Sequence, residues 1–288
     1  MTEHVINKSM DRDDLLAPWA QPRIAAINAL IARLYAAGTP MTSWYGSLPE
    51  DGREQEVQQA LARGEQTTVG MANRGPDYVA LPGAADDLRI PWYLYWEIIW
   101  VMTHGPQLKP GSRVLDAGGT ASLFSCYLAS LGHELHSIDL NQRLVAQGEK
   151  IAAAMGWNLH SYVMNMAELS FADGYFDHAY SICVFEHLDH ELKQRALTEM
   201  ARVLRPGGVL SITFDYRNPA PYVVGTGHDD RPHNQLATMA DLQRAFLSTG
   251  LFELMGNPQF VDNGKRYLVH PARDDRPYSF GAQFLRRR

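Results

Sequence analysis

Two carboxylates and a pair of glycines stand at spacings that suit nucleotide chemistry. The strand-like segment 114–117 carries Asp116 near its end and leads directly into Gly118-Gly119. A second strand-like segment ends at Asp139, 21 residues after Gly118. A glycine turn lets a ligand approach the backbone, and a carboxylate about 20 residues farther on can accept both hydroxyls of a ribose. These residues therefore predict a βαβ unit that binds a nucleotide or nucleoside.

The turn lacks the glycines of a pyrophosphate site. Such a site needs Gly-x-Gly-x-x-Gly, so that backbone N–H groups and a helix N-terminus face the anion. Counted from Gly118, the third and sixth positions are Thr120 and Leu123. Asp116, just before the turn, is a poor neighbour for a phosphate and a good one for a cation. The segment therefore favours a zwitterionic nucleoside over a dinucleotide.

These residues resemble the first motif of class I S-adenosylmethionine-dependent methyltransferases, which reads apolar-apolar-Asp-x-Gly-x-Gly-x-Gly. Asp116 and Gly118 match that motif, whereas Thr120 and Ser122 replace its second and third glycines. Small residues at those two positions narrow the loop that the family places around the methionine moiety.

Three further segments resemble motifs of the same family, and they follow in the family's order. Asp139 stands at the place of the ribose-binding acid. Residues 165–171 resemble the Asp-Ala-x-x-Leu-Pro-Phe segment beside the adenine, and residues 204–210 resemble the Leu-Lys-Pro-Gly-Gly turn before the fifth strand. The resemblance covers roughly residues 106–270 and does not include the first hundred residues.

The resemblance implies S-adenosylmethionine as the cofactor. Asp116 would support the turn and the ammonium end of the cofactor, Asp139 would bind the ribose, and the side-chain oxygen of Asn165 would accept from the adenine amino group. The expected cofactor-binding residues are Asp116, Ala117, Gly118, Gly119, Thr120, Asp139, Leu140, Asn165, Met166, Ala167, Val184 and Phe185.

Each of the three polar residues also has a structural alternative. Asp116 can act as a strand-end acid that caps the turn. Asp139 can be the N-cap of a helix that begins near Gln142. Asn165 can form a local turn with its own backbone.

Residues just past the fourth strand face the methyl group in this fold, so the resemblance places Glu186 and His187 on the acceptor side. An imidazole ordinarily titrates near neutrality, which suits His187 to act as a general base for an oxygen or nitrogen acceptor. Tyr216, at the end of the fifth strand, is the third candidate catalytic residue. The alternatives are a surface or helix-capping role for His187 and a loop start for residues 215–217.

The segment at 228–233 reads His-Asp-Asp-Arg-Pro-His and carries residue types that suit a divalent ion. It lies in a Gly/Pro-rich stretch, and its candidate ligands have no regular spacing. We interpret it as a solvated lid loop and predict no metal site.

Strands and helices alternate from residue 110 onward, which predicts a parallel sheet with helices on both faces. A capping box of Thr238 and Asp241 opens a helix that ends at Gly250. Residues 252–255 and 266–270 suggest a closing antiparallel hairpin. The fold predicted is α/β: a Rossmann-like, mostly parallel seven-stranded sheet with a C-terminal antiparallel strand and an N-terminal helical cap. The expected strands are 113–117, 134–139, 160–163, 178–184 and 209–213, and the expected helices are 121–132, 142–155 and 190–204.

The N-terminal third reads as helical. Apolar residues recur at helical spacing over 15–35, with Pro22 marking either a break or a helix start, and a short polar helix is expected at 54–62 before a loop at 64–91. Trp92, Trp96 and Trp100 form a stripe on a helix at 92–103. We interpret the stripe as core packing that holds the cap to the sheet, with a role for Trp92, Tyr93 or Tyr95 in the acceptor pocket as the alternative. The predicted domains are 1–105, the cap and linker on the acceptor side, and 106–288, the cofactor-binding catalytic domain.

Composition limits the classes of function. The 288 residues carry a net charge of −6 and are 45% hydrophobic, enough for a sizeable core but with no basic surface for nucleic acid. The first ten residues are polar, and no apolar run reaches the roughly 18 residues that span a bilayer. Cys126 and Cys183 suggest neither a disulfide framework nor a metal site. We expect a cytoplasmic protein, a solvated tail at 286–288 and no nucleic-acid or membrane partner; the oligomeric state stays open.

The predicted function is methyl transfer from S-adenosylmethionine to a small-molecule acceptor, at oxygen or nitrogen rather than carbon. The enzyme would position the acceptor in line with the methyl group, exclude water and, where needed, deprotonate the acceptor. The alternatives are a nicotinamide-dependent (NAD) oxidoreductase, an aminopropyl transferase and a regulatory protein that binds the cofactor without catalysis.

Overall fold

The structure, a computed structural model, describes residues 5–39, 92–218, 222–223, 227–228, 236–267 and 277–288. The helix expected at 54–62, the loop at 64–91 and most of the segment at 228–233 lie outside the described residues. Within the described ranges, no helix is long and apolar enough to cross a membrane.

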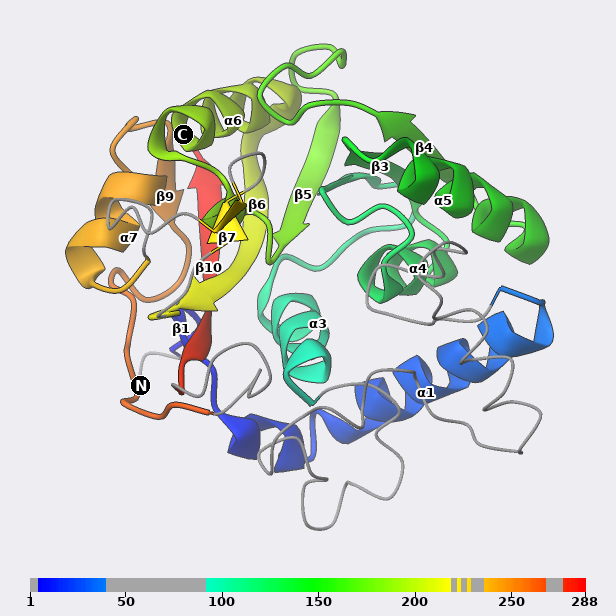
Figure 1. The fold of residues 1–288 in the computed structure, drawn as a ribbon, viewed down its shortest axis with the longest axis horizontal. Coiled ribbons are helices and arrows are strands. Elements are labelled where there is room, and N and C mark those ends of the chain that lie inside the picture. The colour runs from blue at the N-terminus through cyan, green and yellow to red at the C-terminus, as the bar shows by residue number, and fades with distance from the viewer. Residues whose placement is uncertain (1–4, 40–91, 219–221, 224–226, 229–235, 268–276) are drawn as a thin grey trace.

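A single eight-stranded sheet forms the centre of the molecule (Figure 1). Its order is β1-β10-β6-β5-β2-β3-β4, and β9 also pairs with β10. The five strands from β6 to β4 are parallel to one another, whereas β10 runs antiparallel to β6. The strands are β1 Lys8–Ser9, β2 Arg113–Ala117, β3 Glu134–Asp139, β4 Leu159–Val163, β5 Phe176–Ile182, β6 Leu204–Tyr216, β9 Phe252–Leu254 and β10 Ser279–Arg287, and a separate pair is formed by β7 Tyr222–Val223 and β8 Gly227–His228. This topology confirms the predicted mostly parallel α/β sheet, with the two-residue β1 as an additional strand.

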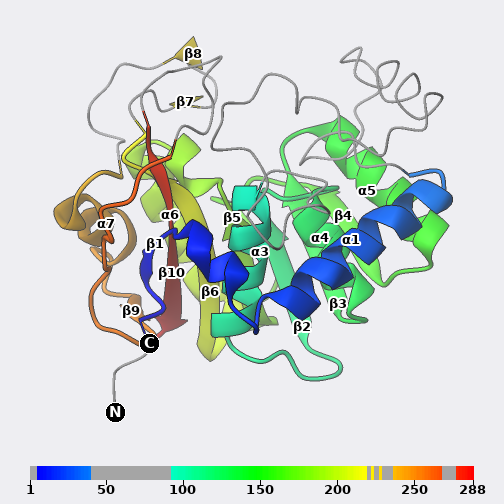
Figure 2. The same cartoon turned by 90° about the horizontal axis from the view of Figure 1, so that it is seen from below.

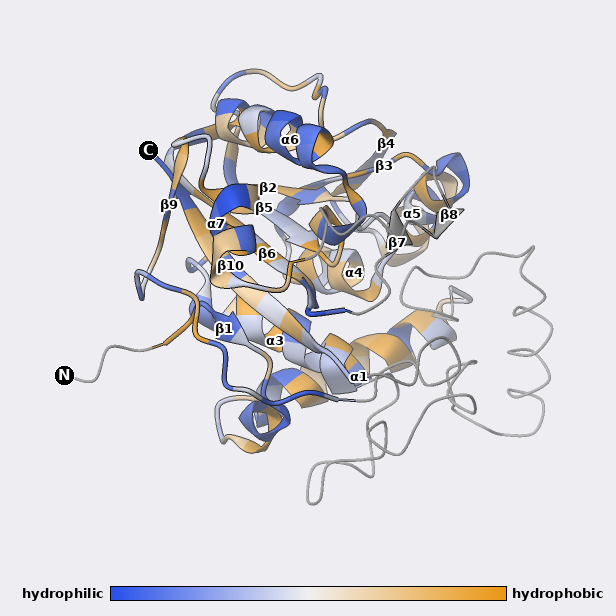
Figure 3. Ribbon diagram, turned by 60° about the vertical axis from the view of Figure 1, so that its left-hand side comes forward, coloured by the Kyte–Doolittle hydropathy of each residue, from blue (hydrophilic) through white to orange (hydrophobic). Residues whose placement is uncertain are grey.

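Helices cover both faces of the sheet and enclose two hydrophobic cores. One core joins α1, α3, α4 and α5 to the sheet, and the other joins α6 and α7 to it. In Figure 2, α1 lies across α3 and α4 on their outer side. Helices α6 and α7 mix hydrophilic and hydrophobic residues, as expected for helices with one buried face (Figure 3). The helices are α1 Gln21–Ala36, α3 Trp92–His104, α4 Leu123–Ser130, α5 Gln142–Met155, α6 His190–Val203 and α7 Met239–Phe246, with 3-10 turns η1 at Arg12–Leu16 and η4 at Phe185–His187.

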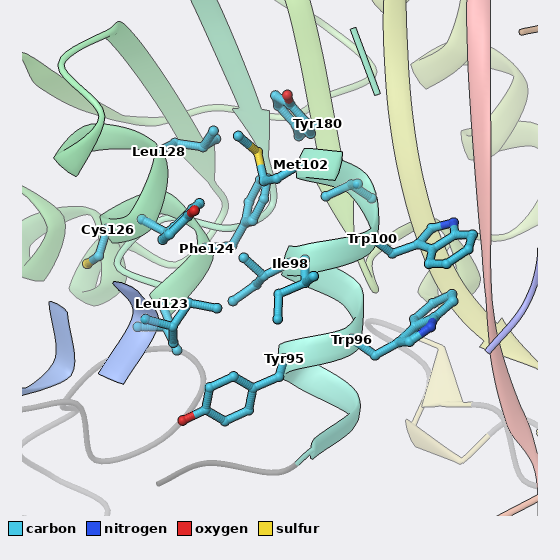
Figure 4. Packing of buried hydrophobic residues seen from close by; sticks show 14 of the residues in the cluster. Tyr95, Trp96, Ile98, Trp100, Met102, Leu123, Phe124, Cys126, Leu128 and Tyr180 are labelled. Carbon is cyan, nitrogen blue, oxygen red and sulfur yellow. The ribbon is translucent and has the colours of Figure 1, made fainter. Parts of the chain in front are cut away.

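The aromatic stripe on α3 packs in the first core, as predicted. Trp96 and Trp100 stack at 5.3 Å on the side of α3 that faces β10, whereas Ile98 points toward α4 (Figure 4). The Tyr95 hydroxyl donates to Asn28 of α1. The Trp100 indole N–H donates to the carbonyl of Ile6 at 2.9 Å, so the stripe also fastens the N-terminal segment. The described part of the first 105 residues thus shares its core with the sheet.

The last strand departs from the prediction. β9 pairs with β10. Of the expected partner segment 266–270, residues 268–270 lie outside the described residues, and Tyr267 forms a bridge to Tyr278. β10 is buried on both faces because the two hydrophobic cores pack on its opposite sides, so its sequence has no polar alternation to signal it. Arg286 and Arg288 are exposed, as expected for a solvated terminus, although β10 continues to Arg287.

Some boundaries differ from the predicted ones for local reasons. β5 ends at Ile182, before the predicted Val184, because Cys183 has a positive φ of 52° that breaks the strand. The Thr238–Asp241 capping box is present, but its helix ends at Phe246, before the predicted Gly250.

Candidate cofactor and acceptor site

The turn after β2 closes tightly over the Asp116 carboxylate. Gly118 has a φ of +85°, and its N–H donates to the carbonyl of Ile138 on β3 at 2.8 Å. A Cβ on Gly118 would lie 2.7 Å from both methyl carbons of Val184, and a Cβ on Gly119 would lie 2.4 Å from Asp116 Oδ2. The backbone therefore contacts a buried carboxylate on one side and the end of β5 on the other, and both positions need glycine.

Asp116 is completely buried beneath this turn. Ser125 Oγ donates to Asp116 Oδ2, whereas Oδ1 has no hydrogen-bond partner among the described residues. Burial raises the pKa of Asp116 to about 7, opposed by the Ser125 hydrogen bond and assisted by the nearby charge of Asp139. The carboxyl group thus supports the turn from below, and a positive group beside the turn would favour its ionised form.

Small polar residues replace the missing glycines and bond beneath the turn. Thr120 Oγ1 lies 2.8 Å from Ser137 Oγ, and Ser125 Oγ donates to the carbonyl of Gly119 at 2.9 Å. Ser122 is the N-cap of α4, since its side chain accepts from the N–H of Ser125 at 3.1 Å. Ser125 and Ser137 were not predicted as site residues. Hydroxyl residues at otherwise apolar helix and strand positions were the feature of the sequence that could have indicated them.

Asp139 lies half-buried at the end of β3, next to the exposed Leu140. Its Oδ1 accepts from the N–H of Asn141 at 2.8 Å, and burial raises its pKa, against the effect of backbone hydrogen bonds from residues 140 and 141. Asn141, not Asp139, is the N-cap of α5, with its side chain accepting from the N–H of Arg143. The helix-capping alternative for Asp139 is therefore wrong.

The segment after β4 lies beside Asp139, because the N–H of Met164 donates to the Asp139 carbonyl at 3.0 Å. Asn165 Oδ1 accepts from the N–H of Ala167 at 2.9 Å, so the local turn considered above is present. Met166 and Ala167 are buried. An amide oxygen has two lone pairs, which leaves one acceptor position on Asn165 for a ligand.

The residues that follow β5 contact different parts of the molecule. Val184 contacts the glycine turn, whereas Phe185 packs against Phe246 of α7 in the second core, with ring centroids 5.8 Å apart. Glu186 is buried, and His187 is partly exposed at the end of η4.

Tyr216 is not brought together with these residues. Its hydroxyl lies 3.2 Å from Asp262 Oδ2 and its ring packs on Phe260, within the core under α7. Neighbouring strand residues point to opposite faces. The side chain of Asp215 therefore lies on the opposite face from Tyr216, near Cys183 and Glu186. Its backbone N–H donates to Glu186 Oε1 at 3.2 Å.

Glu97 is a further residue of the site that was not predicted from the sequence. It comes from α3, is completely buried, and lies with its Oε1 2.6 Å from Cys183 Sγ. Burial raises the pKa of Glu97 to about 8. A single acid within a helix of tryptophans and isoleucines was the available signal. We call Glu97, Cys183, Glu186 and Asp215 the acid cluster.

Comparison with known proteins agrees with this geometry. Residues 115–212 match a family described as "Methyltransferase domain". The chain is 33% identical over 127 residues to the O-methyltransferase rstn1 of Aspergillus nomiae, covering 41% of this chain and 55% of the relative. It is also 33% identical over 140 residues to the ubiquinone/menaquinone biosynthesis C-methyltransferase UbiE of Vibrio vulnificus, covering 46% and 52%. The matches thus span about half the length of these curated relatives.

Solved structures show the same fold at low identity. The [4+2]-cyclase SpnF is 17% identical, with a TM-score of 0.53, and the match covers 86% of this chain and 98% of that one. The MccD protein is also 17% identical, with a TM-score of 0.50 and coverage of 73% and 99%. The motif order and the sheet topology agree with the match of residues 115–212 to the methyltransferase domain family.

Proposed function

We propose that this protein transfers a methyl group from S-adenosylmethionine to a small-molecule acceptor, with oxygen or nitrogen as the atom methylated. The observation that carries the proposal is the pair of carboxylates around one glycine turn. Asp116 lies buried beneath Gly118-Gly119, and Asp139 stands at the end of the adjacent strand. This arrangement suits a cationic nucleoside, whereas a pyrophosphate on the turn would face a buried acid.

The cofactor would extend along the carboxyl ends of β2, β3 and β4. In this proposal Asp139 binds the ribose hydroxyls, Asn165 accepts from the adenine amino group, and the backbone at Gly118 and Thr120 surrounds the methionine part. The methyl group would then face the end of β5, where Val184 contacts the turn. Ligands of open α/β sheets bind at this edge, which supports the orientation.

The acceptor would approach from the side of η4, with Glu186 and His187 nearest the methyl group. The net charge of −6 gives no attraction for nucleic acid and supports a small acceptor. The matched relatives include both an O-methyltransferase and a C-methyltransferase, and it is the polar groups after β5 that support an oxygen or nitrogen acceptor.

Asp139→Ala should weaken the binding of S-adenosylhomocysteine by about 1–3 kcal/mol, which is about 5- to 150-fold in Kd. The loss follows from removing the acceptor for both ribose hydroxyls. Calorimetric titration measures it, with NADH as the parallel ligand. Glu253→Ala is the matched control, because it removes one negative charge at the far end of the sheet. Unchanged affinity in Asp139→Ala would place the nucleoside elsewhere, and binding of NADH alone would move the function to redox chemistry.

His187→Ala should lower kcat by about 100-fold or more if His187 is the general base. The Kd of S-adenosylhomocysteine should stay within about twofold, since the side chain is assigned to the acceptor. His190→Ala, an exposed histidine three residues on, is the control. Once an acceptor is found, single-turnover kinetics separates the two parameters. Full activity of His187→Ala would leave that residue a structural role only.

A further inference from the structure

We propose that the acid cluster is a binding site for one divalent transition-metal ion, with Cys183 Sγ and the carboxylates of Glu186 and Asp215 as ligands. Their three donor atoms lie within 4.8 Å of one another. They come from the end of β5, from η4 and from the end of β6, while Glu97 reaches the same place from α3. No metal site was predicted from the sequence, where Cys183 was considered only as one of two distant cysteines.

Hydrogen bonds already orient the two carboxylates as ligands require. Glu186 Oε1 accepts from the backbone N–H of Asp215 at 3.2 Å, and Asp215 Oδ2 accepts from the Asn218 side-chain amide. Metal-binding carboxylates are typically held by such outer hydrogen bonds. Glu186 thus keeps its second oxygen, Oε2, for the cluster.

Two buried oxygens in the cluster lack a partner. Glu97 Oε2 and Glu186 Oε2 have no hydrogen-bond partner among the described residues, although the two side chains are only 0% and 4% exposed. Leaving a buried carboxylate oxygen unsatisfied is costly. Glu97 Oε1 is already occupied by the Cys183 thiol, so its carboxylate faces into the cluster. A cation at the centre would satisfy oxygens that the protein alone does not.

The charges of the acid cluster also favour a bound cation. Three carboxyl groups and a thiol gather here, and the described cation that acts on them is Lys193, a buried residue of α6 whose charge reaches Glu186. One ammonium group does not balance the cluster. A divalent ion would, and it needs much less room than an organic cation among donor atoms this close.

The donor set indicates which ions would bind. A thiolate with two carboxylates suits Zn²⁺, Co²⁺ or Fe²⁺, whereas Mg²⁺ and Ca²⁺ prefer oxygen ligands throughout. On binding, the Cys183 S–H bond breaks, the thiolate coordinates the ion, and the proton is released to the solvent. No oxidant or reductant is needed.

The ion would lie on the acceptor side of the proposed cofactor site. Val184, between Cys183 and Glu186, is the residue that contacts Gly118 of the turn. A metal ion there could hold an acceptor oxygen next to the methyl group. This consequence rests on the proposed function, whereas metal binding itself does not.

Cobalt provides the test, because a Co²⁺–thiolate bond has a sulfur-to-metal charge-transfer absorption. The full chain, freed of metal and without nucleoside, should bind one equivalent of Co²⁺ with that absorption, and Zn²⁺ should displace it. Cys183→Ser should lose the absorption, whereas Cys126→Ala should keep it, since Cys126 lies on α4 outside the cluster. Glu186→Gln and Asp215→Asn should each weaken Co²⁺ binding by about tenfold or more, with Glu253→Gln unchanged.

Three results would overturn the metal site. The first is no Co²⁺ or Zn²⁺ uptake by the folded wild-type chain. The second is a charge-transfer absorption that persists in Cys183→Ser. The third is thermal stabilisation by methylammonium without any metal uptake, which would assign the cluster to an organic cation. Binding of S-adenosylhomocysteine, measured separately, distinguishes these failures from a failure of the proposed function.

Discussion

Replacing Gly118 with alanine should weaken the binding of S-adenosylhomocysteine by about 100-fold or more, equivalent to about 2.7 kcal/mol. Alanine at a φ of +85° is strained by about 1–2 kcal/mol. In addition, the new Cβ would lie 2.7 Å from both Val184 methyl carbons, so either the turn or the end of β5 has to move. Both lie at the proposed methyl-transfer site, and binding should therefore suffer more than folding.

Gly132→Ala is the matched control for this substitution. Gly132 has nearly the same φ, +83°, but an added Cβ would meet no atom within 4 Å. It should lower the free energy of unfolding by about 1 kcal/mol and leave the Kd unchanged. Calorimetric titration and chemical denaturation of both variants give the comparison. If the two variants bound equally well, the turn after β2 would not be the nucleoside site.

The parts of the fold that were predicted with correct bounds carry strong local signals. β2 and β3 are short apolar runs that each end on an acid, and they occupy 113–117 and 134–139 as predicted. The helix at 142–155 is bounded by Asn141 at its N-cap and by Gly156, whose φ of +65° ends it. Such capping residues set helix ends independently of the rest of the fold.

The prediction failed where distant segments decide the structure. β10 is stabilised by pairing with β6 and β9, and the part of it at 279–285 is buried, so neither alternation nor turn residues mark it. The exposed arginines at 286 and 288 agree with the expected solvated terminus, but the strand that precedes them was not predicted. Long-range pairing of this kind is not encoded in any short window of sequence.

For the candidate site, too, some residues could be predicted from the sequence and others could not. Asp116, Gly118 and Asp139 could be placed together because strand ends of a parallel sheet meet at one edge. Glu97 could not, since its approach to Cys183 depends on how α3 packs against β6. The side-chain direction of Tyr216 could not be predicted either, because it depends on β6 continuing to residue 216, which places Tyr216 in the core under α7.

Asp116→Asn should become more stable relative to the wild type as the pH rises from about 4 to about 7. Burial raises the folded-state pKa of Asp116 from 3.8 to about 7. Between these values the unfolded chain has lost the proton while the folded chain retains it, so the wild type loses stability as the pH rises. The neutral amide has no such dependence. The difference in free energy of unfolding between the two proteins should therefore grow by about 4 kcal/mol and level off above pH 7.

The difference between variant and wild type, rather than the wild-type curve, isolates this effect. His178 is also buried, which lowers its pKa to about 3, so its contribution to stability rises with pH over part of the same range and masks that of Asp116. Glu97, whose pKa burial raises to about 8, acts in the same direction as Asp116. Both effects cancel in the subtraction, provided that the free energies of unfolding are measured by denaturant titration without ligand at each pH. A difference that stays constant from pH 4 to 7 would mean that Asp116 is ionised in the folded protein, and a positive group would then have to lie beside the turn.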